Sequence, residues 1–355
     1  MMRQRIWKRL GKFALACLAL FLVLGVAGYV YFLGFRLDEL PDADPQSLPA
    51  DLAYLRNSVQ TPRGKVLAIV TSTSTNPNTG KPTGYELTEL SRAYYVFVAN
   101  GYEVDIASPL GGEPPMVLDD GLVAADHAFL NDPVAKQKRE NSLPVAAVEP
   151  GDYAAVYLVG GKGTFFDFPD NVDIQRIART IYTDGGVVSA VCHGPAALLN
   201  VTLDDGSPLL GGKRLTGFTH AEELFLTSKA RQVFPFLLQD SLSGKSALFV
   251  EGDLYLDNSV VDGRLVTGQN PWSTWSTAEA VITALGHVPV VRERSSEEIA
   301  VDLVQRYYRE GAEAARQARK ELPQIERRLI LMHAIVAGMQ TRWRDAWQLQ
   351  RLARP

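Results

Sequence analysis

The apolar residues of the chain form one long N-terminal run and, after it, a series of short runs separated by turn-forming residues. Short continuous apolar runs bounded by glycine, proline and asparagine are typical of strands that are buried on both faces of a parallel sheet. We predict strands at 65–70, 102–107, 153–159, 186–191 and 257–267, and helices at 85–100 and 276–285. This alternation predicts an α/β fold with a doubly wound, mostly parallel sheet and helices on both faces.

The long N-terminal run is sufficient to cross a membrane. Residues 13–34 contain no charged side chain, and as a helix they would extend about 33 Å, compared with the ~30 Å of a bilayer's hydrocarbon core. Tyr29, Tyr31 and Phe32 lie near its far end, where membrane helices carry an aromatic belt. A cleaved signal peptide is the alternative, but its apolar core is usually only ~7–15 residues long. We therefore predict an uncleaved transmembrane helix.

The charges on either side of this run predict its orientation. Five basic residues and no acidic residue precede it, whereas several aspartates and a glutamate follow it between positions 38 and 44. Positive charge is retained on the cytosolic side of a membrane helix. We therefore expect a cytosolic N-terminus and an extracytoplasmic catalytic domain, in the periplasm or outside the cell.

Changes in composition predict five parts of the chain. They are a basic N-terminus at 1–12, the membrane helix at 13–34, a linker rich in Asp and Pro at 35–60, a catalytic domain at 61–290 and a helical extension at 291–355. In the extension we expect one helix from Ser296 to about Lys320 and a second, after Pro323, to about Leu352.

The second of these tail helices carries an apolar stretch at 329–339 that is too short to span a bilayer. Arginines flank the stretch, and Trp343 and Trp347 follow it. Two interpretations stay open: a helical hairpin packed on the domain or on a partner, and an amphipathic element that lies on anionic lipid.

Composition narrows the function classes. Apolar residues make up 46% and charged residues 21%, as in a globular protein, and 36 basic against 40 acidic residues give no support for a nucleic-acid partner. The two cysteines, Cys17 and Cys192, exclude a disulfide scaffold and an iron–sulfur cluster. The five histidines show no metal-ligand spacing, and no phosphate loop or dinucleotide motif is present. We therefore predict no metal and no cofactor.

The residues GGVVSAVCHGPAAL at 185–198 predict a nucleophile elbow. An apolar strand ends abruptly at Cys192, and Gly194 and Pro195 then begin a helix. Such a turn exposes a nucleophile at the carboxyl edge of the sheet. The positive N-terminal end of the helix and the neighbouring His193 favour the thiolate, so we expect the pKa of Cys192 to lie below the ~8.5 of a free thiol.

A glycine-rich turn, GGKG at 160–163, follows the preceding predicted strand. Without side chains, its backbone N–H groups can approach a ligand closely. They are candidate donors to a carbonyl oxygen that becomes negative when Cys192 attacks the carbonyl carbon.

Six motifs in order resemble the ThiJ/PfpI superfamily, which has the class I glutamine amidotransferase-like fold, and in it the branch of glyoxalase III and heat-shock chaperones. They are TGYELTEL (83–90), ANGYEVDIASPLGG (99–112), YLVGGKGTFFDFPDN (157–171), VVSAVCHGPAALLNV (187–201), LTGFTHAEE (215–223) and VDGRLVTGQNPWST (261–274). The resemblance spans about residues 60–288 and implies a flavodoxin-like sandwich with a nucleophile elbow.

The resemblance also implies roles for single residues. Cys192 matches the family's nucleophile and His193 the histidine beside it, while Gly161 and the backbone of His193 match the donors to the oxyanion. Glu89 matches the helix-borne glutamate that contacts the sulfur, in preference to Glu86.

Two points of the resemblance stay open. The family's acid that orients the histidine matches Glu223 best, with Glu222 as the alternative. Lys162 stands where the branch often carries a histidine.

The resemblance implies a cysteine-dependent lyase that converts 2-oxoaldehydes into 2-hydroxy acids without glutathione, or a related stress-protective activity. A cysteine amidase or peptidase and a chaperone-like holdase are the alternatives. The expected partners are a small carbonyl substrate and the membrane, with a homodimer as an open question.

Overall fold

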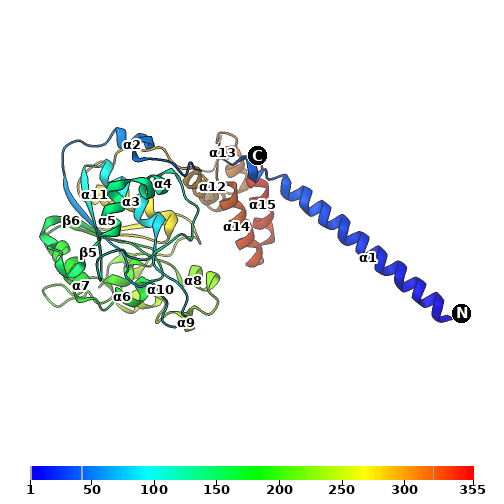
Figure 1. The fold of residues 1–355 in the computed structure, drawn as a ribbon, viewed down its shortest axis with the longest axis horizontal. Helices are drawn as coiled ribbons and strands as arrows, with labels where there is room; N and C mark the ends of the chain where they lie inside the picture. The colour runs from blue at the N-terminus through cyan, green and yellow to red at the C-terminus, as the bar shows by residue number, and fades with distance from the viewer. Residues whose placement is uncertain (1, 41–42, 323) are drawn as a thin grey trace. The chain divides into compact units, whose positions relative to one another are not determined.

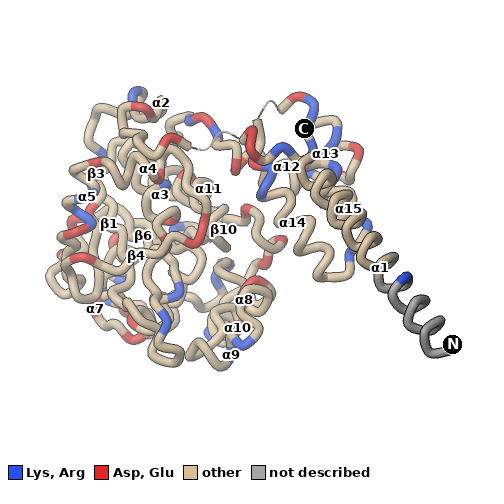
Figure 2. The backbone as a smooth tube through the Cα atoms, turned by 45° about the vertical axis from the view of Figure 1, so that its right-hand side comes forward, with Lys and Arg blue, Asp and Glu red and all other residues tan. Residues whose placement is uncertain are grey.

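The computed structural model describes residues 2–40, 43–322 and 324–355. The chain divides into two compact units, which we call the sheet unit (residues 42–295) and the helical unit (residues 1–41 and 296–355). In the sheet unit acidic and basic residues are interspersed rather than gathered by sign (Figure 2).

The sheet unit is built on a seven-stranded sheet with the order β10-β11-β7-β6-β1-β3-β5. All neighbouring strands are parallel except the pair β10 and β11. The central strands are buried along most of their length, as their continuous apolar sequences predict. The strands are β1 (Gly64–Ile69), β3 (Tyr102–Ser108), β5 (Leu143–Pro144), β6 (Tyr153–Leu158), β7 (Val187–Val191), β10 (Ser259–Asp262) and β11 (Leu265–Gly268). The predicted doubly wound sheet is confirmed.

Helices cover the sheet on both sides (Figure 1). Helix α3 (Leu87–Ala99) packs beside α11 (Thr274–Ala284), and α7 (Val172–Thr183) packs on β6 and β7. The remaining helices of this unit are α2 (Ala53–Arg56), α4 (Ala124–Asn131), α5 (Pro133–Glu140), α6 (Thr164–Asp167), α8 (His220–Leu226), α9 (Ala230–Val233) and α10 (Leu238–Gly244). Two short strand pairs lie outside the main sheet: β2 (Tyr85–Glu86) with β4 (Met116–Val117), and β8 (Arg214–Leu215) with β9 (Leu248–Phe249).

Two predicted elements of this unit differ from the structure in more than their end residues. The strand predicted at 257–267 is a hairpin of β10 and β11, because Gly263, with φ +61°, reverses the chain. The helix predicted after Cys192 is a single 3-10 helix of five residues, η5 (Gly194–Leu198).

The helical unit contains α1 (Met2–Leu33), α12 (Ser296–Glu310), α13 (Ala312–Arg319), α14 (Arg327–Met339) and α15 (Trp343–Ala353). Each of the two predicted tail helices is therefore divided into two helices. Gly311, with φ +93°, separates α12 from α13, and a turn at Thr341, with φ +61°, separates α14 from α15. The segment Cys17–Glu39 is long and apolar enough to cross a membrane, and a signal sequence would have the same features.

Candidate active site

Cys192 lies at the sharp turn between β7 and η5. Its φ of +56° places a residue with a side chain in the left-handed region, which is the backbone strain expected of a nucleophile elbow. The turn is held by two hydrogen bonds: the Cys192 N–H donates to the Gly268 carbonyl, and the Phe218 N–H donates to the Cys192 carbonyl. A Cβ at Gly194 would come within 2.1 Å of the Leu158 carbonyl oxygen, so this turn requires glycine there.

His193 lies between the sulfur and a carboxylate. Its Nδ1 is 3.2 Å from the Cys192 sulfur, and its Nε2 is 2.6 Å from Glu223 Oε2. Because an ionised carboxylate only accepts, Nε2 carries the hydrogen that binds Glu223, which leaves Nδ1 of a neutral ring free to accept the thiol proton. The rings of Phe165 and Phe218 pack on His193 at centroid distances of 4.9 and 4.5 Å. This arrangement can extract a proton from Cys192.

The two neighbouring glutamates have different surroundings. Glu222 accepts five hydrogen bonds, from the Thr219 backbone and hydroxyl, from the Tyr255 backbone and from the amides of Gln269 and Asn270. Glu223 contacts His193, and its second oxygen has no partner among the described residues. Of the two glutamates that the sequence left open, Glu223 is thus the one that meets the histidine.

Glu89 lies on α3 and is completely buried. Its Oε2 accepts a hydrogen bond of 2.8 Å from the Gly160 N–H, and its carboxyl is close enough to the Cys192 sulfur to interact with it. Within the described part of the chain, Oε1 has no hydrogen-bond partner of good geometry. A Cβ at Gly160 would come within 2.5 Å of Glu89 and 2.8 Å of Cys192, so glycine is required for this approach. The structure therefore brings Glu89, Cys192 and His193 together.

Burial dominates the ionisation of this cluster. It raises the pKa of Glu89 well above the ordinary value of a carboxyl group, and the charge of Glu86 adds to the effect. Burial also raises the pKa of the Cys192 thiol, and a negative charge on Glu89 would raise it further. The structure thus contradicts the expectation of a thiol pKa lowered by a helix end, because η5 has only five residues and Cys192 is only 4% exposed.

Two backbone N–H groups, one in the GGKG turn and one directly after Cys192, are available to a ligand. The N–H groups of Gly161 and His193 donate no hydrogen bond to any of the residues that the structure describes. Gly161 has φ +102°, and a Cβ there would come within 2.4 Å of the Gly84 carbonyl oxygen, so the turn depends on glycine. Their role as donors to an oxyanion stays a prediction.

A second group of acids lies next to Glu89. Glu86 accepts a hydrogen bond from the Asp119 N–H, and burial, followed by the charge of Asp120, raises its pKa to about 8. Burial also raises the pKa of Asp120 to about 6. Lys162, the departure in the GGKG turn, forms a half-exposed ion pair with Asp119. The described residues contain no group of three or more His, Cys, Asp or Glu arranged to hold a metal ion.

The profile of the DJ-1/PfpI family matches residues 81–284, which is more than half of the chain. The chain belongs to the DJ-1/PfpI family. This confirms the resemblance given by the six sequence motifs.

Several similar proteins of this family carry glyoxalase names. "Glyoxalase 3" of Candida albicans is 36% identical over 230 residues, which cover 62% of this chain and 97% of that protein. "Glutathione-independent glyoxalase HSP31" of Saccharomyces cerevisiae is 34% identical over 248 residues, which cover 63% of this chain and 98% of that protein. These similarities support an enzyme of the DJ-1/PfpI type.

Solved structures support the same fold. The crystal structure of glyoxalase III from Candida albicans matches with a TM-score of 0.57 and 34% identity, over 62% of this chain and 97% of that one. Rapid Encystment Protein 24 KDa from Francisella tularensis matches with a TM-score of 0.59 and 33% identity, over 62% of this chain and 99% of that one.

Sequence reasoning missed two features of this DJ-1/PfpI site. The sequence predicts the GGKG turn as a source of N–H groups for a ligand, whereas the N–H of its first glycine, Gly160, donates to Glu89. The aromatic packing of Phe165 and Phe218 on His193 has no local sequence signal, since Phe165 lies on α6 and Phe218 lies in the loop before α8.

Proposed function

We propose that this protein is a glutathione-independent glyoxalase, held at a membrane by α1, that converts a 2-oxoaldehyde into a 2-hydroxy acid through a covalent bond to Cys192. The observation that carries the proposal is a buried cysteine with a proton carrier on each side, His193 and Glu89. Hydrolysis of an amide needs a nucleophile and one base. An internal redox reaction, in which a proton moves from one carbon to the next, uses a second acid–base group as well.

The reaction begins with the thiol. His193 takes the proton of Cys192 through Nδ1, and Glu223 stabilises the imidazolium that forms. The sulfur then attacks the aldehyde carbon, C1, and the C1 oxygen faces the N–H groups of Gly161 and His193. Glu89, which burial keeps protonated, gives its proton to this oxygen. The product of this step is a hemithioacetal.

The next step moves hydrogen within the substrate. Glu89, now a carboxylate, takes the proton from C1, so that the C1–H electron pair forms a second bond between C1 and C2. The electron pair of the C2 carbonyl moves to its oxygen, which takes a proton from the His193 imidazolium and completes the enediol. The same proton returns to C2 while the C1 hydroxyl loses its proton to solvent or His193, which leaves a thioester on Cys192. Water cleaves the thioester and releases the 2-hydroxy acid and the thiol. C1 is oxidised and C2 reduced, so the overall change is the addition of one water and needs no redox partner.

Burial of the nucleophile favours a small substrate. Cys192 is 4% exposed and His193 is 2% exposed, so a two- or three-carbon aldehyde reaches the sulfur more easily than a folded polypeptide does. The relatives' names point to the same substrate class.

The membrane part of the proposal rests on α1. Its exposed apolar residues extend from Phe13 to Leu33, with five basic residues before them. The positive-inside rule then gives an extracytoplasmic sheet unit. A C-terminal reporter that is active only in the cytosol would show no activity with this topology.

A cysteine amidase is the second candidate, because the series Cys192, His193 and Glu223 also has the geometry of a hydrolase triad. The test is to incubate the detergent-solubilised full chain with methylglyoxal, without glutathione, and with a panel of peptide amides. We expect lactate from the wild type and none from Cys192→Ser. Cleavage of amides through Cys192 without lactate would replace the glyoxalase proposal by the hydrolase.

A further inference from the structure

The helices α14 and α15 leave an apolar face uncovered. They pack against each other, yet four large apolar side chains remain 54–70% exposed on them: Ile335, Met339, Trp343 and Trp347. Ile335 and Met339 are four residues apart on α14, and the tryptophans are four apart on α15, so each pair lies on one side of its helix. We call these four residues the hairpin face.

The side of α15 that bears the tryptophans is also the side that meets α1. Trp343, Trp347, Gln350 and Arg354 recur at spacings of four, three and four, which places them along one helix face. The Tyr31 hydroxyl of α1 donates a hydrogen bond of 2.8 Å to Gln350 Oε1. The Arg354 guanidinium lies 4.5 Å from the centre of the Tyr31 ring. The tryptophan side is therefore continuous with the end of the apolar helix.

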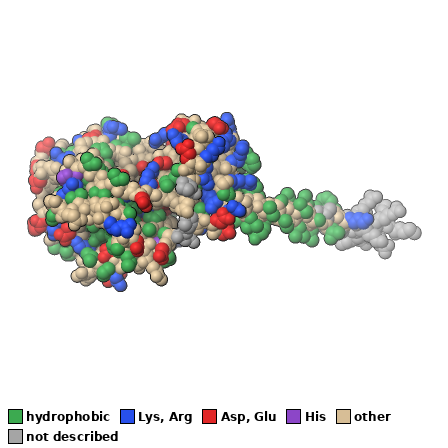
Figure 3. Space-filling model, turned by 90° about the horizontal axis from the view of Figure 1, so that it is seen from above, with side chains coloured by type: hydrophobic (Ala, Val, Ile, Leu, Met, Phe, Trp, Pro, Cys, Tyr) green, Lys and Arg blue, Asp and Glu red, His purple; other side chains and the backbone are tan. Residues whose placement is uncertain are grey.

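The segment that carries the hairpin face is rich in basic residues. Residues 327–355 contain six arginines and a single acidic residue, Asp345. All the arginines except Arg327 are exposed. Figure 3 shows apolar side chains along the described part of α1 and many basic side chains on the surface next to its C-terminal end. Apolar side chains beside arginines are typical of segments that lie in the interface of an anionic bilayer.

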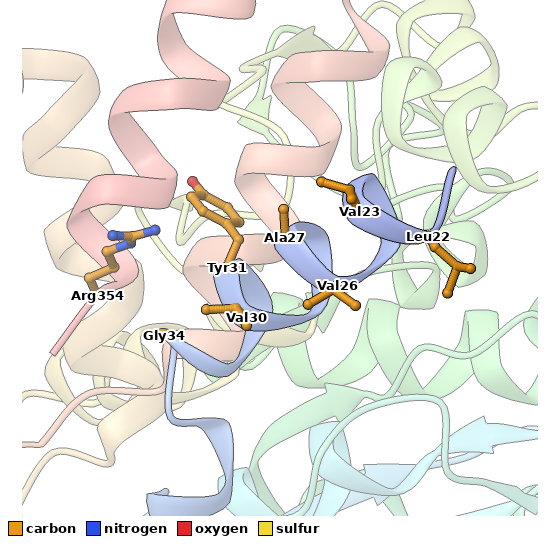
Figure 4. A pocket seen from close by; sticks show the side chains of 8 residues that line it. All are labelled: Leu22, Val23, Val26, Ala27, Val30, Tyr31, Gly34 and Arg354. Carbon is orange, nitrogen blue, oxygen red and sulfur yellow. The ribbon is translucent and has the colours of Figure 1, made fainter. Parts of the chain in front are cut away.

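A groove continues this surface along α1. It has a volume of about 770 Å³ and is lined by aliphatic residues of α1 between Leu22 and Val30, by Tyr31 and Gly34, and by Arg354, the one charged residue among them. Figure 4 shows Tyr31 pointing from α1 toward Arg354. An acyl chain fits the aliphatic wall, and a phosphate fits the guanidinium at its end.

We propose that the hairpin face is a second membrane-contacting element, which enters the interface of an anionic bilayer beside α1 while the surrounding arginines bind lipid phosphates. The proposal rests on the membrane part of the proposed function. Continuity with α1 selects the bilayer as the occupant, because a helix that spans the membrane brings the tryptophan side of α15 to its surface. The helical unit then contacts the membrane through α1 and through the hairpin face.

The experiment places a dye on the hairpin face. In the full chain with Cys17→Ser and Cys192→Ser, Trp347→Cys and, as a control on α13 of the same unit, Gln317→Cys are labelled with a nitrobenzoxadiazole dye. Each protein is inserted into nanodiscs of phosphatidylcholine with phosphatidylglycerol, and aqueous dithionite is added. We expect the dye at 347 to be reduced about tenfold more slowly than the dye at 317. Arg344→Gln with Arg351→Gln, or phosphatidylcholine alone, should reduce this protection.

Equal reduction at both positions in discs that retain the protein would overturn the proposal and leave the α1 anchor intact. Loss of the protein from the discs would overturn both this proposal and the proposed α1 anchor. Protection at 347 that persists without lipid and rises with protein concentration would show that a second copy covers the hairpin face instead, and would also overturn the proposal.

Discussion

In the proposed reaction the protonation state of Glu89 determines how Cys192 is activated, and replacing Glu89 by leucine tests that state. Burial raises the pKa of this carboxyl well above its ordinary value, so we expect the resting group to be neutral and to carry a hydrogen. Oε2 accepts from the Gly160 N–H, which leaves the hydrogen on Oε1, the oxygen without a partner among the described residues. This O–H can donate to the Cys192 thiolate and so lower the thiol pKa, which burial raises.

The size of the effect follows from the strength of such a bond. A hydrogen bond to a charged group contributes about 1.5–3 kcal/mol, and one pKa unit corresponds to about 1.4 kcal/mol. Glu89→Leu removes the donor and keeps the site buried. It should therefore raise the pKa of the Cys192 thiol by about 1–2 units.

The assay is the pH dependence of iodoacetamide labelling of Cys192 in the folded full chain, in a background of Cys17→Ser. Glu86→Gln is the matched control, since Glu86 lies one turn away and does not contact the sulfur; it should shift the thiol pKa much less. A lower thiol pKa in Glu89→Leu would show that Glu89 is ionised at rest. That result would refute the reasoning, because a charged neighbour raises the thiol pKa and its removal lowers it.

Three further predictions concern single residues. Glu223→Gln should lower kcat about 10²-fold with little change in stability, because Glu223 contacts His193. Glu222→Gln should lower the free energy of unfolding, measured in urea, by about 3 kcal/mol, because the new amide N–H₂ would face the donor groups of Gln269 and Asn270. The reverse pattern would exchange the roles of the two glutamates. Glu86 keeps its proton in the folded state up to a pKa of about 8 but loses it near the ordinary carboxyl value when unfolded, so folding stability falls as pH rises between these values. Glu86→Gln should thus stabilise the protein at pH 8 and not near pH 4, as measured by urea unfolding; equal effects at both pH values would contradict this. Cys192→Gly should be about 1 kcal/mol more stable than Cys192→Ala in the same measurement, because glycine relieves the positive φ; equal stabilities would show that the elbow stores no strain.

The sequence predicts the central strands and the elbow because their signals are local. The apolar run that becomes β1 and the abrupt change from valine and alanine to Cys-His-Gly-Pro need no tertiary information. Other signals were present but missed. Asp262-Gly263 marks a hairpin turn inside the strand predicted at 257–267. Thr219 and Glu222 form a capping box at the start of α8, which would have assigned Glu222 to the backbone and left Glu223 for His193.

Other features of the site depend on the whole fold. The burial of Glu89 results from the packing of α3 against the turn at Gly160, which lies far away in the sequence. This burial and the shortness of η5 have no local signal around Cys192, which is why a thiol pKa lowered by a helix end was expected from the sequence. The contact between α1 and α15 likewise joins residues more than 300 positions apart.

The most direct test of the account is to look for the covalent intermediate. The full chain is mixed with excess methylglyoxal and quenched with acid within the first turnovers, and the peptide that contains Cys192 is analysed by mass spectrometry. A thioester mechanism predicts a mass gain of one methylglyoxal on Cys192, which hydroxylamine releases as the hydroxamate of lactic acid. Glu89→Gln should give no lactohydroxamate, because the reaction stops at the hemithioacetal, which releases methylglyoxal rather than a lactoyl group. Lactate formation without any hydroxylamine-sensitive adduct on Cys192 would contradict the account.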